Sequence, residues 1–300
     1  MPGQAVETDV RPSHVATKTD GCPLCHGTHI EHLFQVARQG KLWRLGHCLD
    51  CGLHFTDPHP TLEDIKHFYT GNYHGEQREE GGTERKFGPK YERYLQWLGT
   101  FVPSGSTLDV GCSTGLFPHM FLKKGYDAEG LELNPESAEW GAAHYGIPIH
   151  CRTIEDHAHT SAKAYDLITM TDVLEHTVNP QETLGVVHRL LNPGGHLLVT
   201  FPDIQAPKSR YYQLLAKVFR RDWLWITCHV PHHTWEFTEP MARNCFQKAG
   251  FTVVGFRRTE PRFRLSGKFG ILSLPADLCD LGPFASRFGT QMEFIMRKNG

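Results

Sequence analysis

The stretch LDVGCSTG, residues 108–115, joins a short apolar run to a helical one. Gly111 and Gly115 let the chain turn sharply at this junction and bring backbone amides close to a ligand. The next apolar run ends in GLELN, which places Glu132 at the carboxyl edge of a second strand. A carboxylate at that position can accept both hydroxyl groups of a ribose. The loop and the acid together predict a site for an adenosine-containing ligand.

Short apolar runs alternate with helical stretches on both sides of this loop. From Ser106 onward they read STLDV, GLFPHMFLKKG, YDAEGLEL, PESAEWGAAHYG, IPIHC and YDLITMTDVLEH, then a helix over residues 180–191 and the strand HLLVTF. FTVVGFRR and MEFIMRKN add two later strands. This rhythm predicts an α/β fold with a doubly wound, Rossmann-like sheet and crossover helices.

The middle of the loop indicates which adenosine ligand fits. In the dinucleotide fingerprint GxGxxG the second glycine admits a pyrophosphate, and that position here is Ser113, followed by Thr114. S-adenosylmethionine (SAM) has no phosphate and tolerates such a loop. Asp109 would be poorly placed beside a pyrophosphate but suits an amino group or a sulfonium. The loop therefore favours SAM over a dinucleotide.

Four of the nine cysteines fall in two CxxC pairs, CPLC and CLDC, which are separated by residues 26–47. Two such pairs can close a tetrahedral zinc site in which every position is filled by sulfur, and a closed site of this kind is structural. The stretch LFQVARQGKLWRLGHC between them predicts two short strands with a turn at Gln39-Gly40. The expected zinc ligands are Cys22, Cys25, Cys48 and Cys51, with a redox dithiol pair as the alternative.

Composition limits the possible partners and the compartment. The 300 residues carry a formal net charge of -2 and a pI of about 6.8, so no overall basic field is present to hold a nucleic acid. No apolar run reaches the roughly 18 residues of a membrane span, and the first twenty residues lack a secretion signal. We therefore expect a cytoplasmic protein, in which paired cysteines bind metal rather than form disulfides.

The motifs, taken in order, resemble those of class I SAM-dependent methyltransferases. The nearest group has an N-terminal zinc ribbon and is similar to quinone and natural-product O-methyltransferases. The motifs are LDVGCSTG, GLELNP, TIED, YDLITMTDVLEHTVNP, LNPGGHLLVTFPD and HHTWEFTEPMARNCFQKAGF. The resemblance spans roughly residues 20–260 and implies a seven-stranded sheet whose last strand, MEFIMRKN, is antiparallel. Ser113 and Thr114 depart from the more frequent glycine-rich ending, and residues 261–290 match no motif.

The resemblance also implies roles for individual positions. The loop after the first strand would contact the methionine part of SAM, the acid after the second strand would hold the ribose, residues 153–155 would border the adenine, and residues 171–172 would line the methyl end. The expected cofactor-binding residues are Asp109, Gly111, Cys112, Ser113, Gly115, Glu132, Leu133, Thr153, Ile154, Glu155, Thr171 and Asp172.

The acceptor side is expected in two places. Methyl transfer to a hydroxyl requires a base, and histidine is suitable because its unperturbed pKa is about 6.5. His176 in VLEH and His232 or His233 in PHHTWEFT are the candidates, with a structural role as the alternative for each. An aromatic insertion at about 203–237 would cover an acceptor pocket or simply cap the sheet edge. The candidate pocket residues are Tyr69, Tyr73, Trp223, Trp225 and Trp235.

These expectations divide the chain into a flexible tail (1–20), a zinc ribbon (21–58), a helical linker or lid (59–104) and a methyltransferase domain (105–300). The leading hypothesis is methyl transfer from SAM to a small-molecule acceptor, with oxygen favoured. The alternatives are C- or N-methylation of a small molecule, methylation of RNA or protein, and a non-catalytic SAM-binding module. A hydride-transfer enzyme is a more distant alternative. No motif specifies the acceptor or the oligomeric state.

Overall fold

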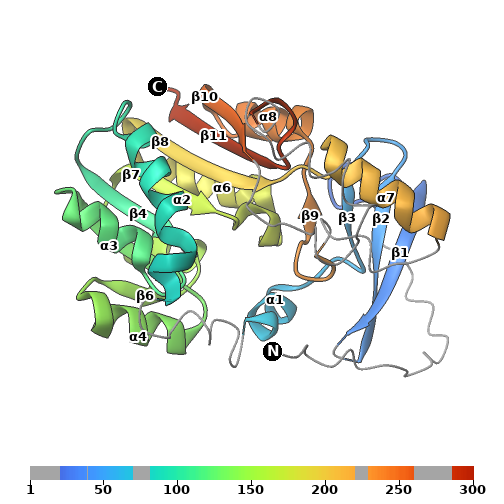
Figure 1. The fold of residues 1–300 in the computed structure, drawn as a ribbon, viewed down its shortest axis with the longest axis horizontal. Coiled ribbons are helices and arrows are strands. Elements are labelled where there is room, and N and C mark those ends of the chain that lie inside the picture. Colours follow the sequence, from blue (N-terminus) through green and yellow to red (C-terminus); the bar gives the residue numbers. More distant parts are fainter. Residues whose placement is uncertain (1–20, 39, 70–81, 220–228, 260–285) are drawn as a thin grey trace.

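The computed structural model describes residues 21–38, 40–69, 82–219, 229–259 and 286–300. The N-terminal tail, Tyr73, Trp223 and Trp225 lie outside the described residues, as do residues 261–285. Two sheets organise the described part, and Figure 1 shows the smaller one to the right of the larger one.

The larger sheet has seven strands in the order β10-β11-β8-β7-β4-β5-β6. Its strands are β4 (Ser106–Val110), β5 (Asp127–Glu132), β6 (Ile149–Cys151), β7 (Tyr165–Thr171), β8 (Leu191–Pro202), β10 (Phe251–Thr259) and β11 (Gln291–Lys298). Strands β6, β5, β4, β7 and β8 pair in parallel, whereas β11 is antiparallel to both β8 and β10. The predicted doubly wound sheet with an antiparallel last strand is therefore confirmed.

Helices cover both faces of this sheet (Figure 1). The helices are α2 (Gly82–Leu98), α3 (Leu116–Lys123) and α4 (Pro135–Tyr145) on one face, and α5 (Ile154–Thr160), α6 (Pro180–Leu190) and α8 (Glu239–Lys248) on the other. Successive strand residues point to opposite faces. Accordingly, Leu167 is buried with residues of α2 and α3, and Ile168 with residues of α6 and α8.

Helix starts follow from local sequence. Asn134 caps α4 and Asn179 caps α6. In both helices a proline occupies the first turn, where a backbone N–H would have no acceptor within the helix, so the N–H that proline lacks is not needed. Thr61 caps α1 (Leu62–Phe68) in a capping box with Asp64. Helix α2 begins at Gly82, within the segment 59–104 that was expected to be a helical linker or lid.

The smaller sheet contains the cysteine-rich segment. Its strands are β1 (Ile30–Arg38), β2 (Lys41–Cys48), β3 (His54–Asp57) and β9 (Trp235–Glu236), in the order β1-β2-β3-β9. The β1–β2 hairpin is the predicted one, with Gly40 at a positive φ of 71° in its turn. The fourth strand was not predicted. It comes from the end of the insertion and pairs Trp235 with Phe55 of β3.

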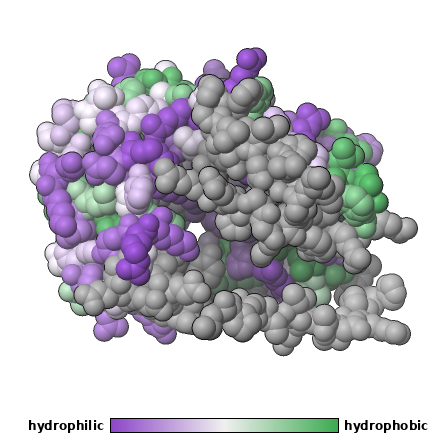
Figure 2. Space-filling model, in the orientation of Figure 1, coloured by the Kyte–Doolittle hydropathy of each residue, from purple (hydrophilic) through white to green (hydrophobic). Residues whose placement is uncertain are grey.

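The insertion contains helix α7 (Pro207–Phe219) before β9. On its inner side, Tyr212 and Ala216 share an apolar cluster with Trp43 and Leu45 of the hairpin and with Phe68 of α1. Its outer side exposes three large apolar side chains, and Figure 2 shows apolar surface at the right edge, where Figure 1 places α7. These side chains are Leu214, Val218 and Phe219. Within the described ranges, no helix combines the length and the apolar character that a membrane crossing requires.

Candidate cofactor and acceptor site

A cavity of about 550 Å³ lies along the carboxyl ends of β4, β5 and β7. In an open parallel sheet, ligands bind outside these strand ends, at the point where the strand order reverses. The cavity wall includes the predicted residues Gly111, Ser113, Glu132, Leu133, Thr153, Ile154, Glu155, Thr171 and Asp172, together with Tyr69 and His176. Residues far apart in the sequence thus converge on one hollow that is large enough for a cofactor-sized ligand.

The loop after β4 has the backbone conformation that its glycine implied. Gly111 has a φ of 70°, and a β-carbon there would lie 2.5 Å from Cγ2 of Val173. Ser113 also has a positive φ, of 53°, and its amide donates a 2.8 Å hydrogen bond to Glu132. The loop therefore presents backbone to the cavity and is tied directly to the acid on the next strand.

Glu132 is 5% exposed and ends β5. Its Oε2 accepts from the amide of Ser113 and its Oε1 from the amide of Asn134, both at 2.8 Å. Burial raises the pKa of Glu132, although these backbone donors act in the opposite direction. A carboxylate oxygen can accept two hydrogen bonds, so both oxygens keep capacity for a ligand hydroxyl.

The predicted adenine border forms the start of α5. Thr153 is the N-cap, and its hydroxyl accepts from the amide of Asp156 at 3.0 Å. Glu155 accepts a 2.8 Å hydrogen bond from the hydroxyl of Thr183 on α6. The side chain of Arg152 lines the same end of the cavity and was not anticipated from the sequence. This end therefore combines the first turn of a helix with polar side chains held by their neighbours.

Helix α2 contributes two cavity residues that sequence reasoning did not assign to the site, Lys90 and Tyr91. The ammonium of Lys90 donates to Asp172 at 2.6 Å. Burial would disfavour a charged carboxylate, but Lys90 holds the pKa of Asp172 below its usual value. Tyr91 stacks on Phe117 of α3, with ring centres 4.5 Å apart. The charged residue beside it was the available signal that one side of the helix faces a polar ligand.

Three predicted cofactor residues lie behind the cavity wall. Asp109 is 2% exposed, accepts from the hydroxyl of Thr169 at 2.5 Å, and has a pKa raised to about 7 by burial. Cys112 is buried, and a β-carbon on Gly130 would lie 2.5 Å from its sulfur. Gly115 is the N-cap of α3, with a φ of 83°. These residues shape the loop from below, and none of them is part of the cavity wall.

His176 reaches the cavity from the short 3-10 helix η2 (Leu174–His176). Its Nδ1 lies 2.8 Å from the carbonyl oxygen of His232, which fixes Nδ1 as the protonated nitrogen. Nε2 therefore carries the lone pair and can accept a proton. Burial, with a smaller contribution from His233, lowers the pKa of His176 to about 3, so the ring is neutral near pH 7.

Glu175 lies under this histidine and is 1% exposed. Neither of its carboxylate oxygens has a hydrogen-bond partner within the described part of the chain, and burial raises its pKa well above the usual value. One ligand atom from each of Glu175, His176 and His233 lies within 4.8 Å of the others. This donor set can hold a proton or a divalent cation. Sequence reasoning selected the histidine of the VLEH motif and missed its acidic neighbour.

The remaining acceptor-side candidates have separate environments. His232 faces Arg38, at 3.2 Å, and its ring centre lies 5.0 Å from that of Phe68. His233 is 5% exposed, and its Nδ1 lies 3.2 Å from Oε1 of Glu236. Neither histidine is part of the cavity wall, in contrast to His176.

Of the aromatic candidates, Tyr69 lines the cavity and Trp235 does not. Trp235 is 4% exposed in β9, and its Nε1 donates to the carbonyl of Val178 at 3.2 Å. The prediction that Trp235 walls the acceptor pocket assumed that the whole insertion covers the cavity. Strand pairing with β3 instead directs this tryptophan into the core beside the ribbon.

The four cysteines of the two CxxC pairs come together at the end of the smaller sheet, with all sulfur atoms within 4.8 Å of one another. The distance is 3.6 Å between Cys22 and Cys51 and also between Cys25 and Cys48. Zn–S bonds of about 2.3 Å in a tetrahedron place sulfurs about 3.8 Å apart. The amide of Leu24 points at the sulfur of Cys22 from 3.4 Å. The geometry and the donor types fit a tetrahedral metal ion.

Comparison with known proteins gives three findings. The family model for a methyltransferase domain matches residues 80–255, more than half of the chain. Ubiquinone biosynthesis O-methyltransferase from Photorhabdus laumondii is 35% identical over 109 residues, covering 35% of this chain and 45% of that protein. The protein of the same name from Proteus mirabilis is 29% identical over 136 residues, covering 44% and 55%. The chain thus spans about half the length of the curated relatives it matches.

Solved structures show the same fold at low sequence identity. A putative methyltransferase in complex with the Trm112 methyltransferase activator, from Haloferax volcanii, aligns with a TM-score of 0.55 at 14% identity, over 79% of this chain and 98% of that one. Magnesium protoporphyrin IX methyltransferase from Synechocystis PCC 6803, with bound SAH, aligns with a TM-score of 0.51 at 14% identity, over 78% and 98%.

Proposed function

Because the chain belongs to the methyltransferase-domain family, we propose that it transfers a methyl group from SAM to an oxygen atom of a small-molecule acceptor. The observation that carries the proposal is the shared cavity: the residues suited to SAM and His176, whose Nε2 carries the lone pair, line the same hollow of about 550 Å³.

Within that cavity, the chain's own groups match the parts of SAM in order along the strand ends. Glu132 offers two carboxylate oxygens to the ribose hydroxyls. The loop at Gly111 approaches with backbone only, and Asp172 offers a carboxylate to the amino group at the methionine end. The first turn of α5, at Thr153, borders the adenine. When bound, SAM supplies a methyl group that its sulfonium already activates, so the protein has to align the acceptor and exclude water.

His176 is the candidate base for the acceptor. The hydrogen bond from its Nδ1 to the carbonyl of His232 keeps Nε2 unprotonated and oriented. A hydroxyl on the acceptor can donate to Nε2 and lose its proton as the new bond to carbon forms. His232 and His233 would then orient His176 without touching the acceptor. His232 does so through its carbonyl, and His233 through the packing of its ring against that of His176, with ring centres 4.8 Å apart.

The names of the relatives support a quinone-pathway acceptor, which carries hydroxyl groups on a flat ring. The described wall offers Tyr69, Phe87 and Tyr91 as apolar surfaces against which such a ring could pack. An unprotonated amine already carries a lone pair and needs no base, whereas the relatives are named as O-methyltransferases and a hydroxyl has a proton that His176 can take. The proposal therefore favours oxygen.

For the four cysteines, we propose a structural zinc ion held by Cys22, Cys25, Cys48 and Cys51. Four sulfur ligands leave no open position on the metal, so zinc would stabilise the ribbon and take no part in methyl transfer. Cysteines that bind metal rather than pair in disulfides are typical of a reducing compartment, so the proposed location is the cytoplasm.

The proposal is tested by incubating the zinc-loaded protein with SAM carrying a labelled methyl group and a panel of catechols, phenols, sugars and carboxylic acids. Mass spectrometry is expected to detect an O-methylated product in equal amount to the demethylated cofactor. His176→Gln, which cannot serve as a base, is expected to lower kcat at least about 100-fold while SAM affinity is kept. Tight SAM binding without transfer to any acceptor would contradict the enzymatic proposal and support a binding module.

A further inference from the structure

The smaller sheet, which contains the ribbon, is hydrogen bonded to the segment that contains His232 and His233. Thr56 of β3 donates twice to this segment: its amide to the carbonyl of Thr234 at 3.1 Å and its hydroxyl to the carbonyl of His233 at 2.6 Å. Strand pairing continues the contact, with His54 opposite Glu236. Thr56 and Thr234 are both fully buried, so water cannot replace these hydrogen bonds.

The opposite side of the same segment is hydrogen bonded to the base region of the cavity. The amide of Thr234 donates to the carbonyl of Glu175 at 2.8 Å, and its hydroxyl lies 2.9 Å from that carbonyl and 2.6 Å from that of Thr177. The carbonyl of His232 accepts the Nδ1 proton of His176 at 2.8 Å. Residues 232–234 therefore lie between ribbon and cavity and are bonded to both.

Apolar packing joins the ribbon to the rest of the insertion. Trp43 of the hairpin is 1% exposed and shares an apolar cluster with Tyr212 of α7 and with Val230, which shortly precedes His232 in the chain. Phe68 of α1, in the same cluster, also packs against the ring of His232. The ribbon thus supports both ends of the described insertion.

The SAM side of the cavity does not depend on the ribbon in this way. Most of its residues come from the loop after β4, the end of β5, the start of α5 and the end of β7, between residues 110 and 183. Helix α2 and the α1 segment, with Leu62, Ile65 and Tyr69, complete the wall. A change in the ribbon should therefore alter the position of His176 and the affinity for the acceptor more than the affinity for the ribose of SAM.

Building on the proposed function, we propose that Thr56 is a positioning residue through which the ribbon holds residues 232–234 against Glu175 and His176, and thereby sets affinity for the acceptor. On this proposal the ribbon is part of the acceptor site, although it supplies no reacting group. The zinc ion would act at the same point, because Cys48 ends β2 and Cys51 lies in the turn that leads into β3.

The chain offers a matched set of variants for the test. Thr56→Val keeps the side-chain shape and removes the hydroxyl donor, whereas Thr56→Ser keeps the donor. Thr107→Val is the control, because the hydroxyl of Thr107 is equally buried in β4 and has no hydrogen-bond partner among the described residues. Thr56→Ala is the second variant, should the valine form fail to fold.

Two readouts separate positioning from general destabilisation. In the zinc-loaded enzyme, Thr56→Val is expected to raise the acceptor KM by about tenfold, the effect of losing one buried hydrogen bond, while SAM affinity by calorimetry stays within about twofold. Thr56→Ser is expected to restore most of the acceptor KM. Thr107→Val is expected to change neither value.

The second readout does not require an active enzyme. Nitrogen-15 NMR of the histidine side chains is expected to show the Nδ1 proton of His176 in the wild type and in Thr56→Ser, and faster exchange of that proton in Thr56→Val. This measurement still decides the positioning role if no acceptor is methylated, so the two proposals can fail separately. An unchanged His176 signal in both Thr56→Val and Thr56→Ala, or an equal loss of SAM and acceptor affinity, would overturn the inference.

Discussion

Replacing Glu132 by alanine should remove most of the affinity for SAM and leave the fold intact. In the native protein the carboxylate ends β5, is 5% exposed, and accepts from the amides of Ser113 and Asn134 at 2.8 Å each. Its remaining acceptor capacity faces the cavity, where we place the ribose. The variant therefore loses two hydrogen bonds to the ligand, and two loop amides lose their partner.

The size of the loss follows from these contacts. A hydrogen bond to a charged group contributes about 1.5–3 kcal/mol, and two bonds that share one carboxylate are not additive, so about 3 kcal/mol is expected. That corresponds to a Kd raised by about 150-fold. Glu132→Gln keeps the side-chain shape but turns an NH2 group toward either Ser113 or Asn134, so a loss of about tenfold is expected.

Isothermal calorimetry with SAM measures both variants, and thermal unfolding of the ligand-free proteins shows whether the fold is kept. Arg152 lines the adenine end of the same cavity, and Arg152→Met is the matched comparison, with a smaller expected loss. A Glu132→Ala protein that is stably folded and binds SAM within threefold of the wild type would refute the assignment of the ribose to this carboxylate.

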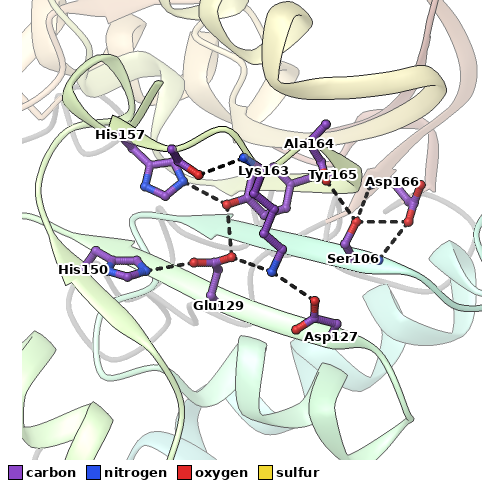
Figure 3. Close-up of polar contacts among 10 residues, drawn as sticks. Ser106, Asp127, Glu129, His150, His157, Lys163, Ala164, Tyr165 and Asp166 are labelled. Carbon is purple, nitrogen blue, oxygen red and sulfur yellow. Dashed lines mark hydrogen bonds and ion pairs between the residues drawn. The ribbon is translucent and has the colours of Figure 1, made fainter. Parts of the chain in front are cut away.

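Three further predictions concern the loop, the ribbon and the sheet. Gly111→Ala should lower the free energy of unfolding by about 1–3 kcal/mol and weaken SAM binding, because φ is 70° and the new β-carbon would lie 2.5 Å from Val173. Adding Val173→Ala should restore part of the lost stability, as measured by thermal unfolding. Cys51→Ser should reduce bound zinc, measured by mass spectrometry, from about one ion per chain to near none in the presence of a chelator, with a lower Tm; full zinc retention would contradict the ribbon assignment. Burial disfavours the charged form of Glu129, but the ammonium of Lys163, 2.7 Å away, helps to hold the pKa of Glu129 below its usual value (Figure 3). The ionised Glu129 therefore stabilises the fold above about pH 4.5, and this contribution is lost as the pH falls through the folded-state pKa. Denaturant unfolding between about pH 5 and pH 3 should therefore show a loss smaller by about 1 kcal/mol in Glu129→Gln, and equal losses would contradict the prediction.

The parallel core of the sheet could be predicted because the alternation of strands and helices has a local signal at each step. LDVGCSTG and GLELN mark the ends of two neighbouring strands, and the alternation of apolar runs with helical stretches leaves few possible topologies. Gly111 and Glu132, which the sequence placed at the ends of these strands, both line the cavity.

The parts that sequence reasoning missed depend on long-range contacts. Nothing local in WEF shows that Trp235 pairs with Phe55, which lies 180 residues earlier in the chain. Lys90 faces the cavity only because α2 packs across α3, and Glu175 is significant only because its carboxylate is buried without a partner in the described residues. Asp109 was expected to contact the ligand from its motif position, and the structure places it beneath the loop, hydrogen bonded to Thr169 and outside the cavity wall.

The most direct test of the cofactor site is a crystal structure of the zinc-loaded protein with the demethylated cofactor bound. We expect both ribose hydroxyls within about 3 Å of the Glu132 carboxylate and the sulfur turned toward the side of the cavity that holds His176. A ribose bound away from Glu132, or a cofactor seated outside the hollow at the ends of β4, β5 and β7, would contradict the account.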